Sequence, residues 1–312
     1  MTSPAVRLDD DRVRVGERLA ISFQRTLRVP DDGRAYPLPP GLGRFPLRRC
    51  ADYADRLPRA WRGDLFIPMY RREALWIAFE GAWWKPNAVK VGVGGIDAVA
   101  GDEWSARLRA SPQNYLVVPD QPWLDGINAG DEWIRQFVAM PLGEGYSVEA
   151  QITGTERRGG LQILAFEPMV GRFPDEPPAR PEAAGAVAMM APQMGIAAGG
   201  RMRQKIYPDK YGVDTWDPER CASIFVHLFP SEEFSAITDE PPPPTPVDTA
   251  AYTAAGLPWF ELHDDEEHDV AAAKALARVK SIRELEERGP DEGVDVGGPQ
   301  IRRLRRKKPN GR

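Results

Sequence analysis

The segment from Gly199 to Asp217, GGRMRQKIYPDKYGVDTWD, concentrates more side chains able to recognise a ligand than any other part of the chain. If the residues after Gly200 are extended, alternate side chains share one face, and three cations then lie together. These are Arg201, Arg203 and Lys205. Arginines grouped in this way could hold a carboxylate or a phosphate through bidentate hydrogen bonds. The segment therefore predicts an anion-binding or sugar-binding loop.

A structural interpretation of the same segment is favoured over the functional one. Asp209, Asp214 and Asp217 could pair with the arginines inside the loop, because ion-pair networks also occur in ordered connections. The glycines match neither a phosphate-binding loop nor a dinucleotide fingerprint. If the functional interpretation holds, the ligand-binding residues are Arg201, Arg203, Gln204, Tyr207, Asp209, Tyr211, Asp214 and Trp216.

A second candidate cluster lies in the segment PDQPWLD and contains Asp120, Gln121, Trp123 and Asp125, with Asp120 and Trp123 as the ligand-binding candidates. An exposed tryptophan could stack on a sugar ring while the carboxylate accepts hydroxyl hydrogen bonds. The alternative is a polar turn whose tryptophan closes the end of the fold. We favour the turn, because large aromatic side chains contribute mostly to packing.

Catalytic and metal-binding patterns are weak. The chain has no Gly-x-Ser-x-Gly motif, and His227 is interpreted as a packed histidine on a strand. His263 and His268 lie five residues apart, which does not match the one-face spacing of a zinc helix. We predict no catalytic residue, no metal site and no cofactor, and lean against an enzyme. A glycosidase with paired carboxylates stays open, since such pairs need geometry to be seen.

Period-two alternation dominates the first half of the chain, beginning with Val13 to Val29. Short strands separated by glycine and proline turns predict an all-β domain over residues 12–235, a sandwich or jelly-roll-like barrel with proline-rich loops. Asp217 followed by proline is read as a helix start. The other predicted strands are Leu65–Tyr70 and Leu75–Trp84 as a hairpin, Val89–Val93, Tyr115–Val118, Trp133–Met140, Tyr146–Ile152, Leu161–Phe166 and Cys221–Phe229.

The C-terminal part reads as a short helical arm. We predict a proline-rich linker over 236–258, an acidic segment with a short helix over 259–289, and a disordered basic tail over 290–312. A capping box at Ser281 and Glu284 allows two shorter helices instead of one. Apolar anchors could dock in a partner's groove or on the chain's own body. These anchors are Trp259, Phe260 and Leu262, and a separate arm predicts that deleting 241–312 leaves a folded β domain.

The composition limits the kinds of partner that the protein is expected to bind. The net charge is −5, but residues 302–312 hold seven basic residues and no acids, so the remainder has 34 basic and 46 acidic residues, a charge of −12. Such a body disfavours specific nucleic-acid binding. No apolar run approaches the ~20 residues of a membrane span. Two widely spaced cysteines, Cys50 and Cys221, are expected to be free thiols of a cytoplasmic protein.

The Gly199–Asp217 segment resembles segments of a family of uncharacterised bacterial β-rich proteins, and PDQPWLDGI and GLPWF resemble them more loosely. The resemblance implies a β-rich fold and brings no activity. From sequence, the chain is therefore expected to be a non-catalytic cytoplasmic binding or scaffold protein, with a protein partner at its C-terminal arm. The alternative is an anion-binding, carbohydrate-binding or hydrolytic β domain that uses the Arg201–Asp217 loop. The oligomeric state stays open.

Overall fold

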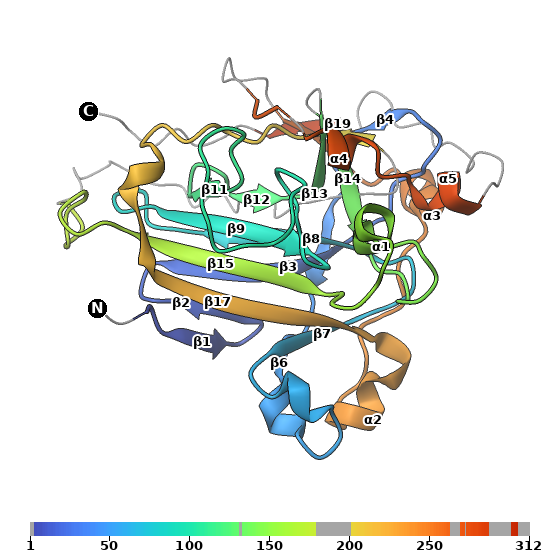
Figure 1. The fold of residues 1–312 in the computed structure, drawn as a ribbon. Coiled ribbons are helices and arrows are strands. Elements are labelled where there is room, and N and C mark those ends of the chain that lie inside the picture. The colour runs from blue at the N-terminus through green and yellow to red at the C-terminus, as the bar shows by residue number, and fades with distance from the viewer. Residues whose placement is uncertain are drawn as a thin grey trace, which may run out of the picture.

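The computed structural model describes residues 3–130, 133–178, 201–262, 269–271, 273–286 and 301–304. Two β-sheets lie one over the other, with a small lobe below them and the C-terminal segments running along the top (Figure 1). The predicted all-β sandwich is confirmed. None of the described helices has the length and apolar character needed to cross a membrane.

The first sheet is built around the N-terminal strands. Its path is β1 (Val6–Asp9), β2 (Arg12–Val15), β3 (Leu19–Thr26), β8 (Ala74–Glu80), β14 (Trp133–Val138), β16 (Arg201–Arg203) and β4 (Ala35–Tyr36). Three short strands pair beside this path: β5 (Gly41–Arg44), β12 (Trp123–Leu124) and β13 (Gly126–Gly130). The predicted alternation over Val13–Val29 is the β2–β3 hairpin, in which Val13 pairs with Ile21.

The second sheet covers one face of the first. Its path is β10 (Ile96–Asp97), β9 (Asn87–Val93), β15 (Leu161–Pro168), β17 (Trp216–Pro230), β7 (Leu65–Met69) and β6 (Arg48–Arg49), with β11 (Leu116–Val118) paired to β9. Alternate residues of both sheets point inward and form the main core, as the two-residue period requires. Ile21, Ile77, Val91, Ile163 and Val226 are all fully buried there.

Three local predictions are wrong. Leu65–Tyr70 and Leu75–Trp84 do not form a hairpin, because β7 pairs with β17 and β8 pairs with β3 in the other sheet. Asp217 starts no helix: it lies in β17, where the register shift between Phe166 and Pro168 of β15 accommodates the residues around it. Sheet pairing has overridden the local helix-start signal.

The third wrong prediction is the strand at Tyr146–Ile152, where the structure has helix α1 (Val148–Thr153). Ser147 caps it, since its Oγ accepts from the Ala150 amide at 3.0 Å, and Gly154 ends it with a φ of 74°. Val148 and Ile152, four residues apart, both pack against the main core. The alternating polarity of this segment also fits one turn of an amphipathic helix.

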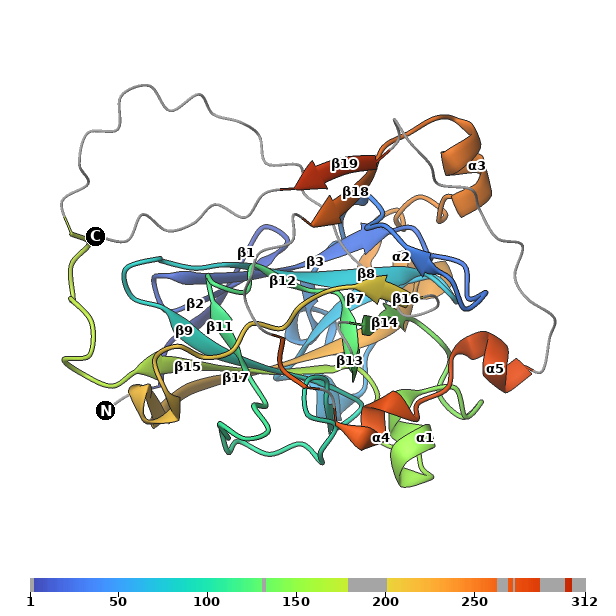
Figure 2. The same ribbon diagram turned by 90° about the horizontal axis from the view of Figure 1, so that it is seen from above.

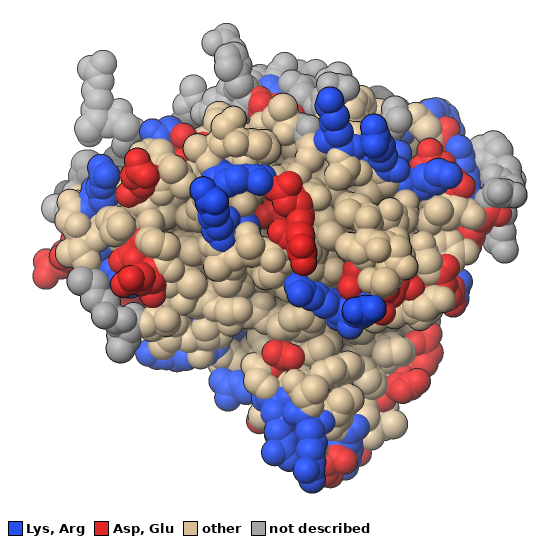
Figure 3. Space-filling model, in the orientation of Figure 1, with Lys and Arg blue, Asp and Glu red and all other residues tan. Residues whose placement is uncertain are grey.

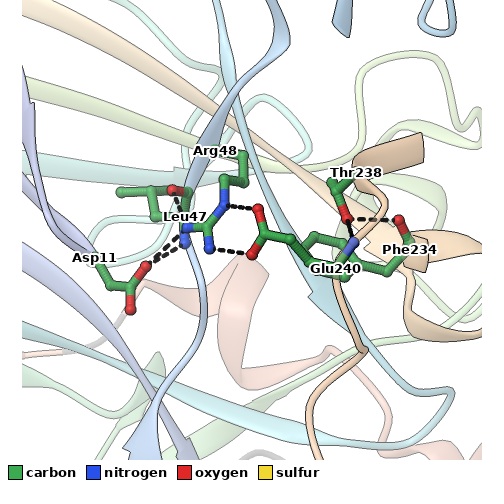
Figure 4. A network of polar contacts seen from close by, with 6 residues as sticks. All are labelled: Asp11, Leu47, Arg48, Phe234, Thr238 and Glu240. Atoms are coloured by element: carbon green, nitrogen blue, oxygen red, sulfur yellow. Dashed lines mark hydrogen bonds and ion pairs between the residues drawn. The ribbon is translucent and has the colours of Figure 1, made fainter. Parts of the chain in front are cut away.

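The lobe at the bottom of Figure 1 contains short helices from two parts of the chain. They are η1 (Cys50–Tyr53), η2 (Arg59–Trp61), η4 (Ser231–Glu233) and α2 (Phe234–Thr238). Arg48 of β6 links the segment after α2 to the N-terminal strands. Its guanidinium donates to both carboxylate oxygens of Glu240, at 2.8 and 2.5 Å, and to Asp11 at 3.0 Å (Figure 4). Both cysteines are free, as predicted, and burial raises the pKa of Cys50 to about 12.

The proline-rich stretch after Glu240 lies against the body. Tyr70 Oη donates to the Pro243 carbonyl at 2.9 Å, and Arg25 donates to the Pro244 carbonyl. Arg25 is itself buried and bonded to Glu73 at 2.7 Å. The chain between the β domain and the arm is thus held on the surface at several points.

The arm beyond it consists of short elements that pack on the body. They are α3 (Thr249–Ala254), β18 (Trp259–Leu262), α4 (Lys274–Ala277), α5 (Ile282–Glu286) and β19 (Ile301–Leu304). The interpretation as two short helices is confirmed, and so is the capping box: the Ser281 amide donates to Glu284 at 2.6 Å, and the Glu284 amide donates to Ser281 Oγ at 3.2 Å. Disorder was predicted for the tail, but residues 301–304 form a strand parallel to β18.

Candidate functional site

The Gly199–Asp217 segment is an ordered connection centred on Asp209. Asp209 Oδ2 accepts from Tyr115 Oη at 2.6 Å and from Trp216 Nε1 at 2.9 Å, while Oδ1 accepts from the Tyr211 amide at 2.8 Å. Burial and the Asp209 carboxylate both raise the pKa of Tyr115. Tyr211 packs edge-on against the buried Trp216, with ring centroids 6.1 Å apart. Asp209 therefore has its acceptor capacity used inside the protein.

The second candidate cluster lies directly beside this connection. Gln204 is buried: its side chain accepts from the Asp125 amide at 2.9 Å and donates to the Trp123 carbonyl at 3.2 Å. Lys210 forms an ion pair with Asp120 at 2.7 Å. The two predicted clusters are thus brought together, but they bind each other.

The remaining candidates of the loop are spread along it. Arg201 and Arg203 belong to β16, whose backbone pairs with β14 and β4, and their side chains lie outside the described part. The Tyr207 amide donates to Gln121 at 3.0 Å. Asp214 is exposed in η3 (Val213–Thr215).

Asp125, a member of the predicted carbohydrate-like cluster, is a buried carboxylate and is not exposed to a sugar. It is fully buried, its Oδ2 accepts from Trp123 Nε1 at 2.9 Å, and its Oδ1 has no hydrogen-bond partner among the described residues. Removal from water raises its pKa well above the ordinary value, because burial penalises the charged form.

The predicted docking anchors are buried in the protein itself. Trp259 and Phe260 belong to a second apolar cluster, outside the main core, with Tyr36, Leu38 and Tyr252. Phe260 also exchanges two backbone hydrogen bonds with Leu38, at 2.7 and 2.9 Å. Leu262 belongs to β18 and pairs with Leu304 of β19, and its side chain is outside the described part. The anchors thus bind the outer face of the first sheet in this structure.

A pocket lies where one end of the sandwich meets the arm. Its cavity volume is about 130 Å³. Both sheets and the arm contribute apolar side chains to its walls: Leu75, Phe137, Val93, Leu161, Leu228 and Ile282. Figure 2 shows α1 beside α4 at this end. There the Lys280 amide donates to Gln151 Oε1 at 2.7 Å, and Gln151 Nε2 donates to the Lys280 carbonyl at 3.0 Å. The arm therefore supplies part of the pocket wall.

Several polar residues also line this pocket, and most have partners. Glu149 is buried, and its carboxylate accepts from the amides of Arg157, Arg158 and Gly159 at 2.9 to 3.2 Å. Gln136 is bonded to the backbone of Leu27 at 2.8 Å. Arg135 is the exception, since its guanidinium has one ion-pair partner among the described residues, Glu284 at 3.2 Å.

Sequence reasoning missed this pocket. Its apolar wall residues come from strands that are distant in the sequence. Of the elements around it, the sequence predicted the arm's helix but not helix α1. Among the described residues, no group of three potential ligands could hold a metal ion, and His263 and His268 lie outside them. On the face shown in Figure 3, acidic and basic side chains are interspersed, with basic ones gathered over the lobe.

Comparison with protein-family models gave no match, and the comparisons with curated proteins and with solved structures gave none either.

Proposed function

We propose that the protein is a non-catalytic binding protein, which holds a small and largely apolar molecule in the pocket between the sandwich and the arm. The observation that carries the proposal is the pocket itself: apolar side chains from both sheets and from Ile282 of the arm converge on one cavity. Concave, mainly apolar cavities with a few placed polar groups are the usual sites of small ligands.

The size of the cavity limits the ligand. An apolar cavity of roughly 150 Å³ binds benzene, and this pocket measures about 130 Å³. The ligand is thus comparable in bulk to one aromatic ring or a short alkyl chain. Burial of that surface supplies about 25 cal/mol per Å².

The groups around the pocket favour binding over catalysis. Ser147 Oγ caps helix α1, and the Glu149 carboxylate accepts three backbone amides. Gln151 is bonded to the backbone of the arm. A hydrolytic site would need a nucleophile within hydrogen-bond reach of a base, and these polar groups are engaged in structural bonds instead.

The other expectations from sequence stay proposals. A protein partner at the arm would have to compete with the cluster that buries Trp259 and Phe260. A sugar or anion at the Arg201–Asp217 loop would have to displace the bonds of Asp209 and Gln204. The two free thiols support a cytoplasmic location.

Thermal unfolding with toluene tests the proposal. Saturable binding to the native state stabilises it and so raises the melting temperature. The stabilisation is about 2.7 kcal/mol at a toluene concentration of a hundred times Kd. Val93→Phe places a ring in the pocket and should abolish the rise. Val170→Phe, at an exposed valine, should leave it intact.

A second filling variant, Leu228→Trp, guards against the chance that Val93→Phe unfolds the protein. No rise in the wild type, or an equal rise in a folded pocket-filled variant, would show that the pocket is not the binding site.

A further inference from the structure

We propose that the ligand of this pocket is a small apolar acid whose carboxylate binds the guanidinium of Arg135. The inference rests on the proposed function and adds the chemical class of the ligand. It starts from a charged residue at a position where the fold calls for an apolar one.

Arg135 lies on the inner face of β14. Side chains alternate along a strand, so Arg135 and Phe137 share a face while Ile134 and Gln136 share the other. Phe137 packs in the main core, whereas Ile134 packs in the second cluster with the arm and Gln136 binds the backbone of Leu27. Arg135 is therefore directed to the interior side of the sandwich, where the sheets open into the pocket.

The guanidinium is shielded from water yet weakly engaged. The Arg135 side chain is 11% exposed, and one of its nitrogens contacts Glu284 at 3.2 Å. That carboxylate is already committed, because Glu284 Oε2 accepts from the Ser281 amide at 2.6 Å as part of the capping box. A guanidinium has five N–H donors in a planar fork that matches a carboxylate. Arg135 therefore retains donor capacity for a bidentate ligand.

Two other acids near the pocket accept hydrogen bonds from backbone amides. Glu149 accepts three backbone amides, and Asp31 accepts from the Arg283 amide at 3.2 Å. Lys280, which is exposed, contacts Gln151 through its backbone. The unused donors of Arg135 therefore offer a place for a carboxylate, while the apolar walls favour a hydrocarbon body.

Hexanoate and hexanol separate the two parts of the argument, because they share an alkyl chain and differ in charge at pH 7. Calorimetric titration of the full-length protein is expected to show hexanoate binding at least about tenfold more tightly than hexanol, as a charge-assisted hydrogen bond is worth that much. Arg135→Gln should remove the preference for hexanoate over hexanol. The exposed Arg278→Gln is the matched control and should behave as the wild type.

The outcomes are distinguishable. If both compounds bind the wild type equally, or if Arg135→Gln keeps the preference, the acid-binding inference is overturned and the proposed function stands. If neither compound binds, the proposed function fails and takes the inference with it. Arg135→Lys offers a second variant that keeps the charge: it should lose part of the preference, because an ammonium cannot pair in a bidentate manner.

Discussion

Asp209 and Asp125, which lie in neighbouring parts of the fold, have opposite environments. Asp209 accepts hydrogen bonds from Tyr115, Trp216 and the Tyr211 amide. Asp125 is fully buried and accepts one, from Trp123. Carboxylates are stabilised as anions by donors and destabilised by removal from water. Asp209 therefore holds three donors in place, whereas burial makes Asp125 stabilise the fold in its protonated form.

The Asp125→Asn variant should gain stability relative to the wild type as the pH rises. Burial raises the folded-state pKa of Asp125 above its unfolded value near 3.8. The unfolded chain then loses this proton first, so the contribution is fully present below about pH 4 and is lost as the pH rises toward the folded pKa. Urea unfolding at pH 4.5 and pH 8 measures the difference, which the isosteric amide lacks. Parallel pH profiles for the two proteins would show that Asp125 is not held in its protonated form.

Removing the Asp209 carboxylate should destabilise the protein strongly. Asp209→Ala leaves the buried Tyr115 hydroxyl and the Trp216 indole without their acceptor, at a cost of roughly 3 kcal/mol. Asp214→Ala, at an exposed aspartate of the same loop, should stay within about 0.5 kcal/mol of the wild type. Equal effects of the two substitutions in denaturant unfolding would argue against the Asp209 network.

At the residue level, the sequence could locate polar side chains but not their partners. Asp209, Gln204 and Asp120 were recognisable as groups that bind something. Their partners Tyr115, Asp125 and Lys210 come partly from distant segments, so only the folded chain shows that the capacity is used internally. Arg135 was overlooked because a single arginine on a strand gives no signal until the face it occupies is known.

The arm is the element that the structure reinterprets most. Its residues contribute to two apolar clusters. Trp259 and Phe260 belong to the second cluster, and Val270, Leu276 and Val279 belong to the main core. Hydrogen bonds also attach the arm to the body. The Ile206 amide donates to Asp269 at 2.7 Å, and the Val270 amide donates to the Ile206 carbonyl at 2.9 Å. An arm integrated to this degree acts as part of the fold.

Substitutions in the arm should therefore destabilise the whole molecule. Leu276 is fully buried, and it packs so closely over Gly101 that a Cβ there would lie 2.8 Å from its Cγ. Leu276→Ala is expected to cost about 2–5 kcal/mol. Lys274→Ala, on the exposed side of the same helix, should cost less than about 0.5 kcal/mol. Deletion of 241–312 should likewise lower the melting temperature, contrary to the expectation from sequence alone.

An unchanged melting temperature in the deleted protein would restore the view of a separable arm. A neutral Leu276→Ala would contradict the packing of α4 on the loop that contains Gly101.

Among the elements, strands with regular alternation were predictable and their partners were not. The β2–β3 hairpin followed from local pattern and a glycine turn. β7 and β8 follow each other in sequence yet join different sheets, which depends on contacts with β17 and β3. Helix α1 was mistaken for a strand because a six-residue segment is too short for the two periods to be distinguished.

On the scale of the whole molecule, apolar clusters lie both between the two sheets and outside them. The main core lies between the sheets, and the arm adds a second cluster on the outer face of the first sheet. The pocket lies at the junction of the sandwich and the arm. A ligand held there would contact both parts, so its binding should also stabilise the attachment of the arm.

Methyl NMR of the full-length protein during titration with hexanoate tests the central claim most directly, because it reports where the molecule binds. We expect saturable shifts in the methyl signals of Val93, Leu161 and Ile282, which line the pocket from the two sides of the junction. The exposed Val170 and Val247 should not shift. Shifts that do not saturate, or that are absent from the pocket and spread over the surface valines, would contradict the proposal that this protein binds a small apolar molecule between its sandwich and its arm.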